Sequence, residues 1–197
     1  MAEPLTWRIA GRSLQLPDDW RARLVARLGA RPRRLGVHAE LALFGALEAL
    51  ADAGETTLPT NALVRVCSLK GPVGAIGTVL DEARSDLPLP FSFLQSQPSQ
   101  MLAALAAALR WQGDATFVVM RDPFALIALA AAQAGSRGML LGWVEEAPAT
   151  SCWLRLVPSA APPTPFEPAT DFARLLNPET RWLQLRGREV AVARETD

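Results

Sequence analysis

One stretch decides how this chain folds: Thr116-Phe-Val-Val-Met-Arg-Asp-Pro-Phe-Ala-Leu-Ile-Ala-Leu-Ala-Ala-Ala-Gln-Ala134. A short β-branched and aromatic run is followed by a sharp turn and a long alanine-rich segment. Asp122 and Pro123 predict a helix start, because the carboxylate can accept from free N–H groups while Pro occupies the first helical position, where no donor is needed. Residues 124–132 have almost no polar face, so we predict a helix covered on nearly all sides. The stretch therefore predicts a buried strand that leads into a buried helix.

The turn between this strand and helix is where several α/β enzymes hold a nucleophile, since a helix N-terminus stabilises negative charge. Here the turn consists of Arg121, Asp122 and Pro123, and none of these is a Ser or Cys. The sequence thus predicts the place for a nucleophile without the nucleophile itself.

Length and composition exclude several classes of protein. A chain of 197 residues suits one domain, and a hydrophobic content of 50% argues against disorder. Twenty basic residues balance twenty acidic ones, which argues against a nucleic-acid binder that relies on a global positive field. The start of the sequence predicts no signal peptide, and no apolar run reaches the roughly 18 residues that span a bilayer. We therefore expect a cytoplasmic protein with no membrane span and no nucleic-acid partner.

No cofactor or metal site is predicted. Cys67 and Cys152 lie far apart in apolar contexts, which favours two buried free thiols over a disulfide or a metal site. The only histidine, His38, lies in the first turn of a predicted helix. The glycine-rich run 71–77 fits neither the dinucleotide fingerprint nor the P-loop, so a closely packed helix start is favoured there over a nucleotide site.

The remaining elements alternate in type, as in an α/β layered fold. Because several helices are apolar all round, we expect a helix layer sandwiched between sheets. We predict helices at 17–28, 37–51, 78–84, 99–109 and 171–176, strands at 62–68, 139–145 and 151–157 with the last two antiparallel, hairpins across 5–16 around Gly11 and across 182–192 near Gly187, and a proline-rich linker at 158–168.

Three segments resemble the N-terminal half of a β-ketoacyl synthase, which has the thiolase-type fold. Residues 93–99 resemble the part before its first buried helix, and residues 109–119 resemble its Gly-Leu-Arg-Gly-Pro-X-X-Thr-Val lead-in. Residues 138–145 resemble its Ala-Asp-X-X-Leu-Ala-Gly-Gly-X-Glu strand. The similarity spans about residues 33–157. It implies an α/β fold, a thiolase-like layered α/β/α half-fold with a mixed sheet and buried helices. We expect this domain to cover 1–157, with the linker, short helix and hairpin of 158–197 packed on it.

The departures from that family concern its chemistry. The family's turn reads Thr-Ala-Cys-Ala/Ser-Ser, and the resemblance places its cysteine at about Asp122, within one residue, where this sequence has none. The family's two active-site histidines lie in a C-terminal half that we expect this chain to lack, and His38 matches neither. Decarboxylative condensation needs a thiolate and oxyanion donors. We therefore expect a protein that is not an enzyme.

Catalytically silent members of the superfamily resemble chain-length factors, and this sequence is similar to the short forms of aryl-polyene and related pigment synthases. The resemblance implies pairing with an active β-ketoacyl synthase subunit and work on chains bound to an acyl carrier protein. It implies a subunit interface on an edge strand, formed by Thr116, Phe117, Val118, Val119 and Met120. It also implies that Phe91, Phe93 and Gln97 lie near the partner's acyl pocket and limit chain length.

Six arginines gather near the start of the chain: Arg21, Arg23, Arg27, Arg31, Arg33 and Arg34. Such a cluster is usually a solvated face, and the alternative is a dock for the acidic carrier protein. Two other functions stay open. One is an enzyme that uses Asp122 as base or nucleophile, although a carboxylate at a helix N-terminus is held ionised and poorly basic. The other is a stand-alone homodimer that binds acyl chains.

Overall fold

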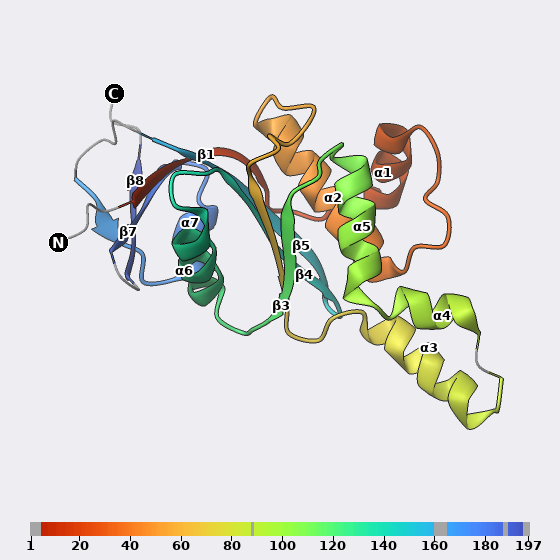
Figure 1. Cartoon of the computed structure of the whole chain (residues 1–197). Helices are drawn as coiled ribbons and strands as arrows, with labels where there is room; N and C mark the ends of the chain where they lie inside the picture. Colours follow the sequence, from red (N-terminus) through yellow and green to blue (C-terminus); the bar gives the residue numbers. More distant parts are fainter. Residues whose placement is uncertain (1–4, 88, 160–164, 187–188, 195–197) are drawn as a thin grey trace.

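A computed structural model describes residues 5–87, 89–159, 165–186 and 189–194, and in it one mixed sheet organises the molecule (Figure 1). Its eight strands lie in the order β3-β2-β4-β5-β1-β7-β8-β6. The strands are β1 (Leu5–Ser13), β2 (Leu63–Ser68), β3 (Asp114–Val119), β4 (Met139–Glu146), β5 (Ala149–Pro158), β6 (Glu167–Pro168), β7 (Thr180–Arg186) and β8 (Glu189–Arg194).

The sheet has a parallel end and an antiparallel end. β2 pairs in parallel with β3 on one side and with β4 on the other. From β4 onward every pairing is antiparallel, beginning with β4 against β5, as predicted. β7 pairs with β1, so the C-terminal strands continue the same sheet.

Helices cover both faces of this sheet. They are α1 (Trp20–Leu28), α2 (Val37–Asp52), α3 (Val73–Arg84), α4 (Pro90–Gln95), α5 (Pro98–Ala108), α6 (Pro123–Ala134) and α7 (Phe172–Leu176). On one face, α2 packs with α1 and α5 in an apolar core that includes Phe44 and Trp153. On the other face, α6 and α7 pack against Trp7 and Ile9. α3 and α4 project from the end of the molecule (Figure 1), and we call this pair the arm.

Two expectations about layers are wrong. The described residues form one sheet with helices on both faces, and they do not form a helix layer between two sheets. α6 is also not covered on nearly all sides. It buries one stripe that includes Leu126, Ile127 and Ala130, whereas Leu129 is 36% exposed. The lack of polar residues on α6 therefore has another cause than burial within this chain.

Three local predictions also differ from the structure. Residues 5–13 form one strand with a bulge between Ile9 and Gly11, because α2 ends against it: a Cβ on Gly11 would lie 2.2 Å from the Ala49 carbonyl oxygen. α3 begins at Val73, so two glycines of the run 71–77 lie inside a helix. α4 was not predicted. The turn near Gly187 and part of the 158–168 linker lie outside the described residues.

Gly45 generates a prediction, because α2 approaches β5 closely there. A Cβ on Gly45 would lie 2.2 Å from Trp153 Cδ1 and 2.3 Å from Ser151 Oγ. We expect Gly45→Ala to lower the free energy of unfolding by about 1–3 kcal/mol, as overpacking does, despite the better helix propensity of Ala. The control is Gly77→Ala in α3, where nothing lies within 4 Å of the added methyl group. Urea denaturation of both variants checks this, and equal effects would contradict it.

Candidate functional site

The side chains that could take part in catalysis or binding lie at the carboxyl ends of three parallel strands. β3, β2 and β4 run in one direction, so their last residues lie at the same edge of the sheet. This is where open α/β sheets bind ligands. The turn after β3, the thiol of Cys67, the imidazole of His38 and the carboxylates of Glu145 and Glu146 all lie at this end.

Asp122 caps α6, as predicted. Its Oδ1 accepts a hydrogen bond of 2.9 Å from the Phe124 N–H, and Pro123 occupies the first helical position. The carboxylate is exposed and already engaged with the helix start, so its position is fully explained by capping.

Cys67 lies beside this turn, which the sequence did not reveal. Its Sγ donates to the Met120 carbonyl oxygen at 3.2 Å. Burial raises the pKa of the thiol to about 11, with a smaller contribution from Glu145, against the opposing effect of the Met120 hydrogen bond. At neutral pH it is a thiol and not a nucleophilic thiolate. Both cysteines are free, as predicted, although Cys152 is only half-buried.

His38 lies on the opposite face of the sheet from Cys67. Its Nε2 lies 3.3 Å from the Val144 carbonyl oxygen, and its ring meets Phe117 edge-on at 5.9 Å. Phe117 belongs to the core beneath α2, whereas Cys67 belongs to the core beneath α6. The sheet therefore separates the imidazole from the thiol, and they cannot form the nucleophile–base pair of a thiol enzyme.

The predicted interface strand, Thr116–Met120, lies at the edge of the sheet. Within the described part of the chain β3 pairs only with β2, and Val119 is 66% exposed. The start of β3 is fixed by the buried side chain of Arg65, which donates to the carbonyl oxygen of Asp114 at 2.9 Å and to its carboxylate at 2.8 Å. This hydrogen bond is the main cause of a lowered pKa for the Asp114 carboxyl group. Among the described residues, no strand pairs with the other side of β3.

The residues predicted to limit chain length lie on and after α4. Phe91 and Phe93 are 50% and 56% exposed, and the Arg34 guanidinium lies 4.8 Å from the centre of the Phe91 ring. Gln97 directly precedes α5 and donates to the Ser96 hydroxyl at 3.1 Å. These side chains lie on the surface of the chain, and a role at an acyl pocket would need a partner.

The arginine cluster divides into two groups. The three arginines of α1 form ion pairs, Arg21 with Glu40, Arg23 with Asp19 and Arg27 with Glu48. The three in the following loop, Arg31, Arg33 and Arg34, are exposed. The α1 group therefore has much of its charge balanced within the chain, as on an ordinary solvated face.

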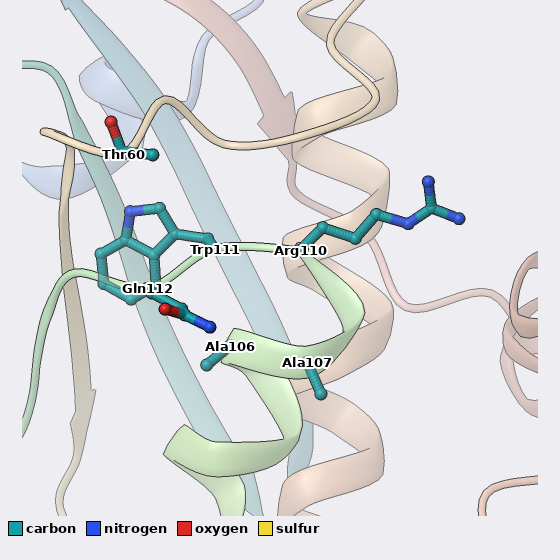
Figure 2. Close-up of a pocket in the computed structure, with 6 residues that line it drawn as sticks. All are labelled: Thr60, Ala106, Ala107, Arg110, Trp111 and Gln112. Carbon is teal, nitrogen blue, oxygen red and sulfur yellow. The ribbon is translucent and has the colours of Figure 1, made fainter.

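A hollow of about 620 Å³ lies at the end of α5 (Figure 2). It is lined by Thr60, Ala106, Ala107, Arg110, Trp111 and Gln112. Arg110, Trp111 and Gln112 precede β3, whereas the Asp122 turn follows it. The hollow and the turn therefore lie at opposite ends of that strand. None of the predicted site residues lines this hollow.

Metal-binding clusters and membrane-spanning helices are both absent from the described part of the chain. No group of three or more His, Cys, Asp or Glu side chains there could hold a metal ion. No helix there is long and apolar enough to cross a bilayer.

Solved structures with a similar architecture are ketosynthases and chain length factors. The ishigamide ketosynthase/chain length factor superposes with a TM-score of 0.61 at 14% identity, over 79% of this chain and 59% of that one. The complex of the ketosynthase ApeO with its chain length factor ApeC from Xenorhabdus doucetiae superposes with a TM-score of 0.53 at 15% identity, over 98% of both chains. A type II acyl-carrier protein in complex with its ketosynthase, AntDE:AntF, superposes with a TM-score of 0.56 at 11% identity, over 79% of this chain and 64% of that one.

This chain has the ketosynthase and chain length factor fold. The fold predicted from the sequence, a thiolase-like layered half-fold with a mixed sheet, is thereby confirmed. The chain spans less than two thirds of the length of two of these three neighbours. No family model and no curated protein matches the sequence.

The capping role of Asp122 gives a direct prediction. Asp122→Ala should lower the free energy of unfolding by about 0.5–2 kcal/mol, because the Phe124 N–H loses its acceptor. Asp122→Asn keeps an acceptor oxygen and should leave stability nearly unchanged. Urea denaturation measures both. An Asn variant that folds normally but loses an activity of the assembled protein would show that the carboxylate has a chemical role.

The burial of His38 should make the free energy of unfolding depend on pH. Burial lowers the pKa of its imidazole in the folded chain, despite the raising effects of the Val144 hydrogen bond and of Glu146 and Glu145. Below the ordinary pKa of about 6.5, the unfolded chain therefore binds a proton more readily than the folded chain. The free energy of unfolding should fall as pH falls from about 7 to 5.

His38→Gln is the control, because the chain has no other histidine. Denaturant midpoints measured across this pH range should fall less steeply in the variant. Equal slopes for the two proteins would contradict the assignment.

Proposed function

We propose that the chain is a non-catalytic, chain-length-factor-like subunit that pairs with an active β-ketoacyl synthase in type II fatty-acid or polyketide biosynthesis of the aryl-polyene kind. The observation that carries this proposal is the open edge of β3, an apolar strand with no strand of the described residues on one side. The turn that follows it, where the family holds its cysteine, has no Ser or Cys.

The groups present at the turn support a subunit that does not catalyse the condensation itself. Asp122 serves as a helix cap, the Cys67 thiol is protonated at neutral pH, and His38 lies across the sheet from it. Condensation needs a thiolate that carries the acyl chain and donors that stabilise an oxyanion. In the proposed complex these groups come from the partner subunit.

The surface around β3 supports the proposed pairing. An exposed edge with apolar side chains is a template for another strand, and natural proteins cover such edges or block them with charge. β3 has no Lys or Pro, and Asp114 at its start is engaged by Arg65.

Exposed apolar side chains concentrate on the arm. Eleven of the thirteen large exposed apolar side chains among the described residues lie between Leu69 and Leu129, and eight of them lie between Val73 and Leu94, on the arm. Apolar surface gathered in one region marks an interaction site. The proposal also explains Leu129 on the outer stripe of α6, which the chain itself leaves uncovered.

The neighbouring structures support the kind of partner. One contains a ketosynthase together with its chain length factor, and another contains a ketosynthase together with an acyl-carrier protein. By analogy, we place a β-ketoacyl synthase on β3 and an acyl carrier protein near the complex. Arg31, Arg33 and Arg34 are the better candidates for contact with that acidic carrier, because the α1 arginines already pair within the chain.

A charge on the open edge of β3 tests the interface. Val119→Lys should leave the chain folded, because that side chain is 66% exposed, but should abolish co-purification with a co-expressed ketosynthase. The control is Leu5→Lys, an exposed apolar residue on β1, which should pair normally. Affinity capture followed by size-exclusion with light scattering gives the composition of each complex.

Several outcomes would count against this interface. Normal pairing of Val119→Lys would remove β3 from it. A wild-type chain that stays a soluble monomer in the presence of the ketosynthase would contradict the pairing itself. A wild-type homodimer that ignores the ketosynthase would favour an acyl-binding homodimer instead.

The aromatic side chains of α4 predict an effect on product length. Phe93→Ala should lengthen the products of the assembled complex and Phe93→Trp should shorten them, because side-chain bulk would limit the extension of the growing chain. Phe91 should behave in the same way. Mass spectrometry of products released by the reconstituted complex measures the distribution. Unchanged distributions in variants that still pair would show that these rings lie away from the acyl pocket.

A further inference from the structure

Glu146, the last residue of β4, holds the starts of two helices at once. Its Oε1 accepts a hydrogen bond of 2.9 Å from the backbone N–H of His38 in α2. Its Oε2 accepts one of 2.6 Å from the backbone N–H of Gly74 in α3. Each N–H belongs to the second residue of its helix. One carboxylate therefore joins the main body of the molecule to the base of the arm.

Both helices need such an acceptor. The residues that precede them, Gly36 and Pro72, provide no side-chain cap. Free N–H groups in the first turn, and the positive end of the helix dipole, favour a carboxylate there. Gly74 also permits the close approach, since a Cβ at this position would lie 2.9 Å from Glu146 Oε2.

Neighbouring contacts hold the connection between β2 and α3. The Glu145 carboxylate accepts from the backbone N–H groups of Leu69 and Lys70, and the Lys70 Nζ donates to the Ala147 carbonyl oxygen at 3.1 Å. The Ser68 hydroxyl accepts from the Gly71 N–H at 2.7 Å. The end of β4 thus fixes the whole segment from which the arm emerges.

The arm has few other means of fixing its direction. Neither α3 nor α4 has a buried residue. The two helices contact each other, partly through Glu82, which accepts from the Leu89 N–H at 3.2 Å and the Ser92 hydroxyl at 2.6 Å.

The core covers neither helix, so contacts at the two ends of the arm hold its direction. At the α4 end, the Arg34 guanidinium lies 4.8 Å from the centre of the Phe91 ring. At the α3 end, the carboxylate of Glu146 is the contact that ties the helix start to the main body.

We propose that Glu146 is a positioning residue that fixes the direction of the arm relative to the open edge of β3, and so places the exposed apolar side chains of the arm against the partner subunit. This inference rests on the proposed pairing with a ketosynthase. The anchoring itself is a property of the single chain, so it can be measured without any partner.

The first measurement uses the chain alone. Amide hydrogen exchange of Glu146→Gln should be about tenfold faster than wild type at Gly74 and through the first turn of α3, because a charged acceptor is lost there. Exchange in β2 and β4 should be unchanged. Glu146→Asp, which keeps the charge but is one methylene shorter, should also accelerate exchange. Glu48→Gln is the matched control, since Glu48 pairs with Arg27 on the surface of α2, and it should exchange as wild type does.

The second measurement adds the ketosynthase. Glu146→Gln should weaken its binding by about tenfold or more, and Glu48→Gln should not. Unchanged exchange in the first turn of α3 would overturn the anchoring role, and faster exchange with undiminished affinity would overturn the link to pairing. A wild-type chain that binds no ketosynthase would instead overturn the proposed function, while the exchange data would still decide whether Glu146 anchors the arm.

Discussion

β3 pairs with β2 along one side, and no other strand of the described residues pairs with its opposite side. A strand edge with unpaired N–H and C=O groups is tolerated in water, but an apolar one invites association. The features around this edge are consistent with one another. Arg65 fixes the start of the strand, α6 leaves Leu129 exposed, and the arm projects nearby with most of its large apolar side chains uncovered. A partner on this edge would satisfy all of these features together.

At the same end of the sheet, carboxylates of the chain itself engage the starts of three helices. Helix N-terminal N–H groups could stabilise an oxyanion, but here carboxylates of the chain occupy them. Asp122 accepts from the start of α6, and Glu146 accepts from the starts of α2 and α3. These charges reinforce the local structure and would repel a developing negative charge. These contacts make the local structure rigid, in keeping with the non-catalytic role proposed above.

Patterns local in sequence predicted local structure well. Asp122 and Pro123 marked the start of α6, and the apolar run at 62–68 gave β2, because capping and strand propensity act over a few residues. Predictions that depended on distant contacts did worse. The predicted hairpin around Gly11 was wrong because α2 packs on that glycine. α4 was missed because the prolines around it suggested irregular structure, whereas Pro90 begins a short helix.

The same contrast between local and distant contacts holds for the candidate site. The sequence alone showed that the turn holds Arg121, Asp122 and Pro123 with no Ser or Cys, and the resemblance to ketosynthases placed β3 at an edge. The position of Cys67 beside the turn was not visible, because it depends on the pairing of β2 with β3. The double cap by Glu146 joins residues far apart in the chain, at His38 and Gly74. The only sequence signal for it was a pair of glutamates at the end of an apolar strand.

The central claim is that β3 is a junction between subunits, and amide hydrogen exchange on residues 114–119 tests it most directly. The chain is measured alone and again with a saturating amount of the active β-ketoacyl synthase. Amides on the open side of β3 should exchange fast in the free chain and become strongly protected in the complex, while those that face β2 stay protected in both. A complex that forms with no change in exchange along β3 would contradict the claim.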